Sequence, residues 1–278
     1  MFGGAAKGSY TRLDRSAVEF EAYYTPLRDF IRSRDLDGLD LDVEEPMSLQ
    51  GMIRLIDRLK ADFGNDFIIT LAPVAPAMYD QDPQKNLSGF SYPALEFERG
   101  HSIEWYNAQF YCGWGDVRKT EGYDNIINTG WRPEKIVMGM ITNPENGSGW
   151  VELSLVQETL INLRLRYPGF GGVMGWEYFN CLPGGKQRPW DWAAWMTRHV
   201  RGWSPSIAGN AVGDEGKKKQ KVVAEGHPGE TAAQTSDVSA KDVSDNSDGA
   251  QPTSSQGAAN EAPSKEGSEQ QPSDRAEG

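Results

Sequence analysis

The feature that most constrains the fold is an alternation of short apolar runs with stretches of helical periodicity over the first 203 residues. Stretches with apolar residues at helical spacing lie around 18–31, 52–63, 155–163 and 192–200. Strand and helix in turn predict βαβ units and therefore an α/β fold with a parallel sheet. The strand-like runs are Met1–Gly4, Leu39–Val43, Phe67–Ala72, Trp105–Tyr111, Ile136–Met140 and Gly172–Trp176.

The composition divides the 278 residues into two parts. All 29 aromatic residues lie at or before Trp203, and residues 204–278 contain no Leu and a single Ile, Ile207. A segment of this kind cannot bury enough apolar surface to offset its conformational entropy. We therefore expect residues 1–203 to form the folded domain and residues 204–278 to form a disordered low-complexity tail.

The charge distribution excludes some classes of partner. The net charge is −12; residues 204–278 hold 7 basic and 13 acidic residues, so the tail and the domain each carry −6. An acidic domain argues against a nucleic acid partner, and we interpret Lys217–Lys221 as a solvated charge cluster. There is no run of 18 apolar residues, so no membrane span is expected. The sequence leaves open whether the protein is extracellular or cytoplasmic.

Cysteine and histidine are too few and too scattered for a metal centre. Cys112 and Cys181 form no CxxC pair, and His101, His199 and His227 lie far apart. We therefore expect no disulfide framework, no metal site and no cofactor. The two cysteines follow strands that another strand separates, a gap wider than the roughly 7 Å that a disulfide spans between Cα atoms, so we expect free thiols.

The most informative segment runs from Asp37 to Glu45. Side chains alternate between the two faces of a strand, so Asp40, Asp42 and Glu44 share one face, with carboxylates about 7 Å apart. Leu39, Leu41 and Val43 share the other face, and Glu45 also points away from Glu44. Buried like charges raise the pKa of at least one carboxyl group. Such a group can stay protonated near neutral pH and act as an acid.

This segment is open to three other interpretations. A solvent-facing acidic edge strand would show the same alternation. A calcium loop starting at Asp35 does not fit, because Gly38 falls at the fourth position and Leu39 occupies a ligand position. A two-metal hydrolytic site is not favoured, because no histidine lies near this segment in the sequence.

The segment from Asp37 to Glu44 resembles the signature of glycoside hydrolase family 18, Asp-Gly-x-Asp-x-Asp-x-Glu, on the fourth strand of a (β/α)8 barrel. Met1–Ala6 resembles the Gly-Gly motif of the third strand, and Gly171–Trp176 resembles the eighth strand. The segment 109–111, Gln-Phe-Tyr, is similar to the sixth-strand Gln-x-Tyr of plant and fungal class III chitinases. The resemblance covers residues 1–203.

The resemblance implies a mechanism and a role for each acidic residue. Glu44 would protonate the glycosidic oxygen, while the N-acetyl oxygen of the substrate attacks the anomeric carbon and no enzymic nucleophile is used. Asp42 would hold the acetamido N–H and stabilise the developing charge. Asp40 would share a proton with Asp42.

The resemblance also implies the residues that bind the sugar. Tyr111 would aim the acetamido oxygen, Gln109 would line the same wall, and Trp176 would form the floor under the −1 sugar. We add Met140, which lines the barrel, and Trp114, from a loop after a strand. Trp150, also in a loop after a strand, could stack on a sugar as Trp114 could. Core packing is the alternative for Tyr111, Trp176, Met140, Trp114 and Trp150.

The resemblance implies a (β/α)8-type barrel, of which strands three to eight are identified, so we expect two βα units to be missing at the N-terminus. We expect the isolated chain to be poorly soluble or inactive, and a version extended upstream to be folded and active. The function that the resemblance implies is retaining, substrate-assisted hydrolysis of β-1,4 bonds in chitin or another N-acetylglucosamine glycan, and we expect a monomer. The alternatives are an endo-β-N-acetylglucosaminidase acting on N-glycan cores and a catalytically silent glycan-binding protein.

Overall fold

The computed structural model describes residues 1–201. Residues 202–278, which include the last two residues of the predicted domain and the whole predicted tail, lie outside the described residues.

Six parallel strands form one sheet in chain order, from β1 to β6. Each overlaps the apolar run predicted for it, and the predicted α/β fold with a parallel, barrel-type sheet is confirmed. Within residues 1–201, β1 and β6 are the edges of the sheet and do not pair with each other. The strands are β1 Phe2–Gly3, β2 Gly38–Asp42, β3 Ile68–Leu71, β4 Trp105–Gln109, β5 Ile136–Ile141 and β6 Val173–Trp176.

Helices separate consecutive strands. The four stretches of helical periodicity correspond to α2, α3, α6 and α7, whereas α1, α4 and α5 were not predicted. The connection from Pro73 to Ser102 contains α4 and three short 3-10 segments. The helices are α1 Tyr10–Leu13, α2 Ala17–Ser33, α3 Leu49–Phe63, α4 Tyr92–Arg99, α5 Glu121–Asn128, α6 Leu153–Arg166 and α7 Trp190–Arg201.

Local sequence signals set the ends of the longer helices. Ser16 and Ser48 are the N-caps of α2 and α3, and their hydroxyls accept from the backbone N–H groups of Glu19 and Gly51. Gly64 ends α3 with a φ of 88°, in the left-handed region that a glycine adopts without strain. The helix therefore stops where the chain must turn into β3.

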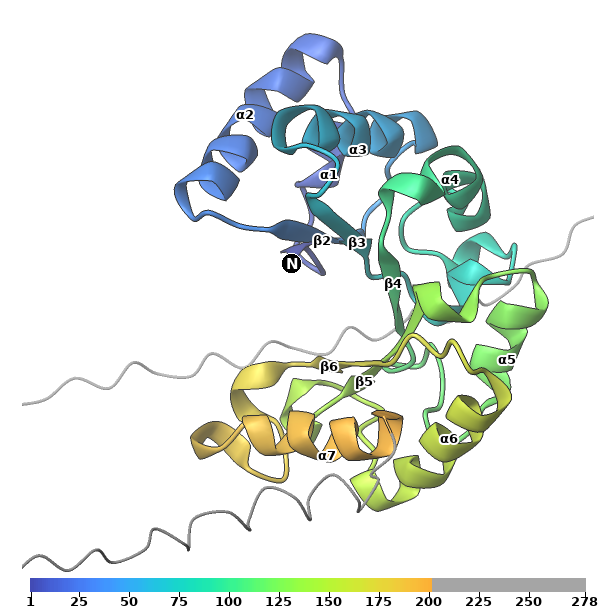
Figure 1. The fold of residues 1–278 in the computed structure, drawn as a ribbon. Helices are drawn as coiled ribbons and strands as arrows, with labels where there is room; N and C mark the ends of the chain where they lie inside the picture. The colour runs from blue at the N-terminus through green and yellow to red at the C-terminus, as the bar shows by residue number, and fades with distance from the viewer. Residues whose placement is uncertain (202–278) are drawn as a thin grey trace, which may run out of the picture. The chain divides into compact units, whose positions relative to one another are not determined.

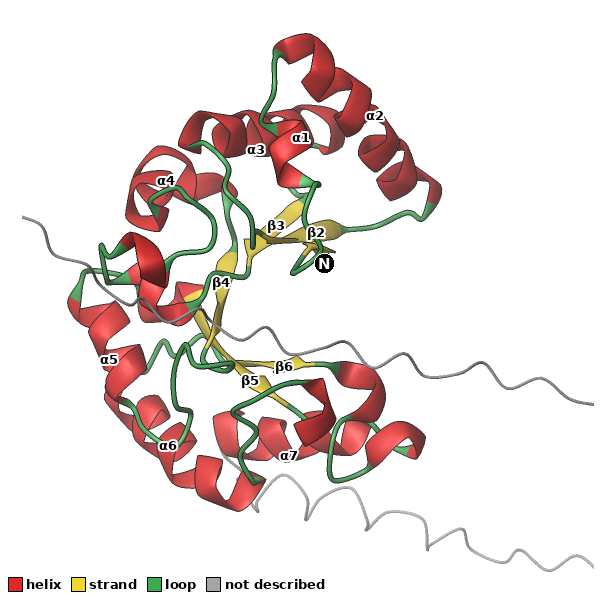
Figure 2. Cartoon of the chain, turned by 180° about the vertical axis from the view of Figure 1, so that it is seen from behind, coloured by secondary structure: helices red, strands yellow, loops and turns green. Residues whose placement is uncertain are grey.

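The sheet curves, with its strands on the inner side of a crescent and the helices along its outer side (Figures 1 and 2). The main core lies between the sheet and the helices. Leu41 and Leu71 from the strands and Leu55 and Ile56 from α3 are fully buried in it. A core on this side of the sheet leaves the opposite, inner face of the strands for polar side chains.

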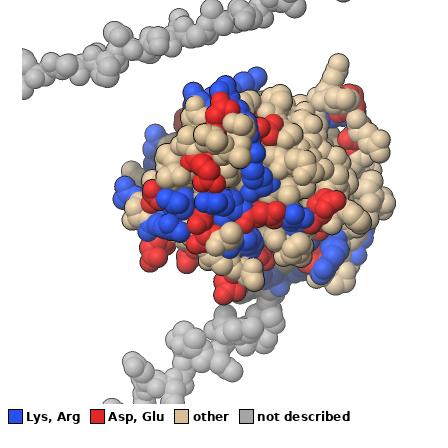
Figure 3. Space-filling view, turned by 90° about the horizontal axis from the view of Figure 1, so that it is seen from above, with Lys and Arg blue, Asp and Glu red and all other residues tan. Residues whose placement is uncertain are grey.

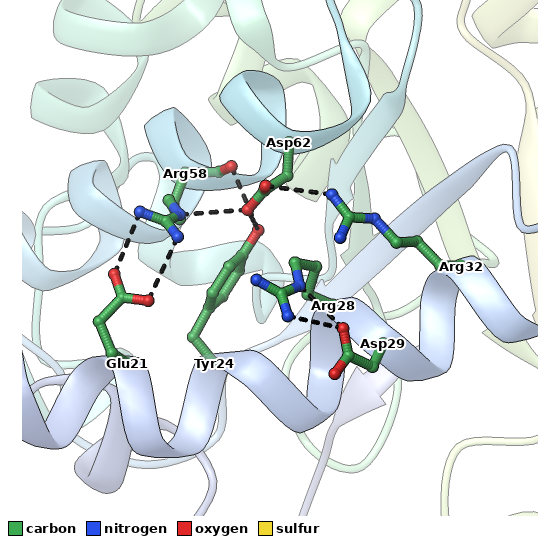
Figure 4. Close-up of polar contacts among 7 residues, drawn as sticks. All are labelled: Glu21, Tyr24, Arg28, Asp29, Arg32, Arg58 and Asp62. Atoms are coloured by element: carbon green, nitrogen blue, oxygen red, sulfur yellow. Dashed lines mark hydrogen bonds and ion pairs between the residues drawn. The ribbon is translucent and has the colours of Figure 1, made fainter.

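The outer surface of α2 and α3 carries charges of both signs, interspersed over the face that lies uppermost in Figure 1 (Figure 3). A network crosses between the helices: Arg58 pairs with Glu21 and Asp62, and Asp62 also accepts from Tyr24 and Arg32 (Figure 4). Exposed ion pairs each contribute little to stability. The packing of α2 on α3 therefore depends mainly on buried side chains such as Tyr24.

The two cysteines are free thiols, as predicted, with Cys112 exposed and Cys181 buried. Within residues 1–201, no helix combines the length and the apolar character needed to cross a membrane.

Candidate active site

Asp40 and Asp42 lie on an interior strand of the sheet, and Glu44 lies two residues beyond its end. β2 pairs with β1 on one side and with β3 on the other, so the interpretation as a solvent-facing edge strand is wrong. Leu41 and Val43 point into the core, as the alternation predicted. Asp42 is 4% exposed although it carries a carboxyl group. A carboxyl group buried to this degree requires hydrogen-bond partners or a bound proton.

The surroundings of Asp42 favour its protonated form. Burial, followed by the negative charges of Glu44 and Asp40, raises the pKa of Asp42 to about 7. Asp42 can therefore hold a proton near neutral pH. Among residues 1–201, no set of three or more His, Cys, Asp or Glu side chains is arranged to hold a metal ion.

Gln109, at the end of β4, joins the acidic residues to one another. Its side-chain amide donates to Asp42 Oδ1 at 3.0 Å, to Glu44 Oε1 at 3.4 Å and to the backbone carbonyl of Ala72 at 2.9 Å. Gln109 is 4% exposed, so these contacts are shielded from water. The structure thus brings together three of the predicted site residues from strands 67 positions apart in the sequence.

Asp40 is held by two residues that the sequence analysis did not predict. Thr70 on β3 donates to Asp40 Oδ1 at 2.5 Å, and the amide of Asn107 on β4 donates to the same oxygen at 3.1 Å. The indole N–H of Trp105 donates to Asn107 Oδ1 at 3.1 Å, which turns the amide N–H group of Asn107 towards Asp40. Two donors on one oxygen fix the direction of the Asp40 carboxyl group.

Tyr111 lies just beyond β4 and is 6% exposed. Burial, then the charges of Asp42 and Glu44, raises the pKa of Tyr111, so its hydroxyl remains a neutral donor. The next residue, Cys112, donates its backbone N–H to the carbonyl of Ser148 at 2.9 Å. A Cβ on Gly149 would lie 3.5 Å from Tyr111 Cα. The loop after β5 therefore packs directly against the backbone of Tyr111.

The remaining predicted residues lie on β5, on β6 and in the loop after β4. Trp176 is the last residue of β6, and its backbone carbonyl accepts from Thr142 at 2.9 Å. Met140 is 2% exposed within the core cluster, and Trp114 is partly buried and packs against that cluster. Contact of any of the three with a sugar stays a prediction.

Solved structures of similar proteins agree with this architecture. One is a fungal endo-β-N-acetylglucosaminidase of glycosyl hydrolase family 18, with 52% sequence identity, a TM-score of 0.68, and coverage of 72% of this chain and 70% of its own. Another is the chitinase ChiC of Aspergillus fumigatus, with 56% identity, a TM-score of 0.63, and coverage of 70% and 69%. Both proteins resemble this chain in amino-acid sequence as well as in fold.

A curated relative matches a smaller part of the chain. Chitinase 2 of Rhizopus oligosporus is 30% identical over 150 residues, which are 51% of this chain. The match spans 25% of the length of that relative. A scan against protein-family models found no match.

The chain shares its curved parallel sheet with these relatives, which are glycosidases. The fold and the relatives therefore place this protein in the class of glycosidases. The chain belongs to glycoside hydrolase family 18. The family expected from the acidic motif on β2 is therefore confirmed.

Proposed function

We propose that the chain hydrolyses β-1,4 bonds between N-acetylglucosamine units, with chitin as its substrate and with retention of configuration at the anomeric carbon. The observation that carries this proposal is the amide of Gln109, which donates both to Glu44 and to Asp42, whose pKa is raised to about 7. A carboxyl group that can hold a proton near neutral pH, next to a second carboxyl group, is the kind of pair that acid–base catalysis uses.

In the proposed reaction Glu44 delivers a proton to the glycosidic oxygen as the bond to the anomeric carbon breaks. The carbonyl oxygen of the substrate's own N-acetyl group attacks that carbon, and a cyclic oxazolinium forms. Water then opens the ring, gives its proton back to Glu44 and leaves the product with the original configuration. Two inversions at one carbon give net retention.

The neighbouring residues are proposed to serve the acetamido group. Asp42 accepts its N–H and stabilises the positive charge that develops on the ring, and Asp40 stabilises Asp42 in this role. Tyr111 donates to the acetamido oxygen, and its raised pKa supports a neutral donor. Trp176, at the end of β6, provides an apolar surface for the sugar.

A second candidate is an endo-β-N-acetylglucosaminidase that acts on the chitobiose core of N-glycans. The specific observation in its favour is the 52% identity and 0.68 TM-score to a fungal enzyme of that activity. The chitinase ChiC matches with similar identity, 56%. The two substrates share the N-acetylglucosamine pair at the cleaved bond, so residues near that bond do not distinguish them. A catalytically silent binding protein is the weaker alternative, because Glu44 is present.

Side-by-side hydrolysis tests the proposal. The 278-residue chain and the upstream-extended version expected from the sequence are each incubated with chitin oligomers and with a high-mannose glycopeptide, and the anomer of the first product is followed by NMR. Cleavage of the oligomers with the β-anomer appearing first supports the proposal. Cleavage of the glycopeptide alone supports the second candidate, and an α-anomer as first product contradicts the mechanism. Binding by both versions without cleavage of either substrate would identify a silent binding protein.

A further inference from the structure

Glu45 follows the proposed acid directly but points to the other face of the strand. It is 2% exposed. Its carboxylate accepts from the backbone N–H of Gly8 at 2.7 Å, from the backbone N–H of Tyr10 at 2.6 Å and from the hydroxyl of Thr11 at 3.1 Å. All of these donors lie more than 30 positions upstream. Glu45 therefore ties the segment after β1 to the end of β2.

The electrostatics of Glu45 agree with a charged carboxylate. Burial opposes its ionisation, but the hydrogen bonds from Gly8, Tyr10 and Thr11 outweigh that effect and lower the pKa of Glu45. The bonds to Gly8 and Tyr10 occupy the N-terminal end of α1, where the N-cap Ser9 makes no side-chain capping bond. Glu45 thus supplies the acceptor that this short helix lacks locally.

The segment held by Glu45 packs against the end of β1. The hydroxyl of Tyr10 donates to the carbonyl of Phe2 at 2.7 Å. A Cβ on Gly3 would lie 2.4 Å from the ring of Tyr10. At this separation no side chain fits, so the positions of Tyr10 and Gly3 fix each other.

The end of β1 in turn packs against Asp42. Gly3 is paired with Asp42 in the sheet, and the backbone N–H of Gly4 donates to the Asp42 carbonyl at 2.8 Å. A Cβ on Gly4 would lie 3.4 Å from Asp42 Oδ2. A continuous series of contacts thus runs from Glu45 through Tyr10 and the two glycines back to the residue two positions before Glu44.

We propose that Glu45 is a positioning residue, which fixes the Gly3–Thr11 segment against β2 and thereby the side-chain directions of Asp42 and Glu44. This role rests on the proposed function, because it acts through Glu44 as the acid. A displacement of about 1 Å in a reacting group can cost about 100-fold in rate. A glutamine at position 45 has one acceptor oxygen and an N–H group that faces a donor, so it cannot replace both carboxylate oxygens.

The test compares Glu45→Gln with Asp14→Asn. Asp14 accepts from the backbone N–H of Ser48 at 2.8 Å and from its hydroxyl at 2.5 Å. It therefore also ties the upstream segment to residues after β2, but it makes no contact with the acidic residues of the site. Both variants remove one carboxylate oxygen from such a tie, and both are expected to lower the unfolding temperature.

Rates on chitin oligomers are measured well below both unfolding temperatures. Glu45→Gln is expected to lower kcat by about 10- to 100-fold with KM within about twofold of the native value. Asp14→Asn is expected to leave kcat within about twofold of the native value. An equal fall of kcat in the two variants, or an unchanged kcat in Glu45→Gln, would overturn the proposal.

A second pair of variants covers the case in which Glu45→Gln does not fold. Thr11→Val removes one donor to Glu45, and Thr11→Ser keeps it. The proposal expects kcat of Thr11→Val to be several-fold below that of Thr11→Ser. Equal kcat values would count against it.

Hydrogen exchange separates this proposal from the proposed function. If the native chain cleaves no N-acetylglucosamine glycan, the proposed function fails, but the amide of Gly4 still reports on the contact with Asp42. Faster exchange of this amide in Thr11→Val than in Thr11→Ser supports the positioning role. In a folded Glu45→Gln the same amide should exchange faster than in Asp14→Asn. If the Gly4 amide exchanges equally fast in the two variants of each pair, Glu45 does not hold the segment against β2.

Discussion

Thr70 donates a hydrogen bond of 2.5 Å to Asp40, from the strand next to β2. Both residues lie on the inner face of the sheet, and Asn107 donates to the same Asp40 oxygen from the strand beyond. The carboxyl group at the base of the proposed site is therefore fixed by side chains from two neighbouring strands.

Removing the Thr70 hydroxyl is expected to impair hydrolysis. Hydrogen bonds to charged groups contribute about 1.5–3 kcal/mol, which corresponds to about tenfold or more in rate if Asp40 must be held for the reaction. We predict such a fall of kcat on chitin oligomers for Thr70→Val, and a value within about threefold of native for Thr70→Ser, which keeps the donor. Equal rates in the two variants would mean that the bond has no part in the reaction.

The stability of the fold is predicted to depend on pH through Asp42. Its pKa is raised from 3.8 to about 7 in the folded protein, so the folded state keeps a proton that the unfolded chain loses. Stability is therefore lost as pH rises through this interval, and the loss is complete above the folded pKa.

The Asp42→Asn variant has no carboxyl group at this position, so its stability does not fall with pH for this reason. Relative to the native protein it should gain on the order of 2–4 kcal/mol in unfolding free energy above pH 7, and the gain should shrink towards pH 4. Denaturant unfolding at a series of pH values measures the difference. A constant difference between the two proteins across the range would contradict the raised pKa.

The sequence predicted the parts of the site that follow from strand alternation. Asp40, Asp42 and Glu44 share a face because they are spaced by two, and Gln109 and Tyr111 were paired in the same way. The same spacing could have identified Asn107, two residues before Gln109. Thr70 was missed because it lies within an apolar run. A single polar residue in such a run is compatible with a buried strand and gives no sign of a functional role.

Contacts between distant segments could not be predicted in the same way. The alternation gives the direction of Glu45 but not the donors 34–37 positions away that satisfy it. The helices α4 and α5 were missed because each has only eight residues and buries two of them, which is too few for a clear helical period.

The proposed use of the acetamido group predicts strict substrate selectivity. Fully deacetylated chitosan lacks the attacking carbonyl oxygen and should not be cleaved, whereas chitin oligomers should be. A thiazoline analogue of the oxazolinium should inhibit more strongly than an oligomer of the same size competes, because analogues of the transition state bind more tightly than substrates. Efficient cleavage of chitosan would rule out substrate assistance.

We also propose that residues 204–278 are dispensable for folding and hydrolysis. Their composition offers no aromatic residue and no Leu to a core. A chain that ends at Trp203 should unfold at nearly the same temperature as the full chain and cleave oligomers at the same rate. A drop of many degrees would show that the tail contributes to the fold.

The most direct test of the account is the hydrolysis rate of Glu44→Gln on chitin oligomers. The account predicts a fall of at least about 10²–10⁴ in kcat, with oligomer binding retained, because the amide cannot donate the proton that the leaving group needs. Glu19→Gln, which changes an exposed carboxylate on α2, serves as the matched control and should keep the native rate. A Glu44→Gln variant that retains about a tenth of the native kcat, a loss far below that of a general acid, would contradict the assignment of Glu44.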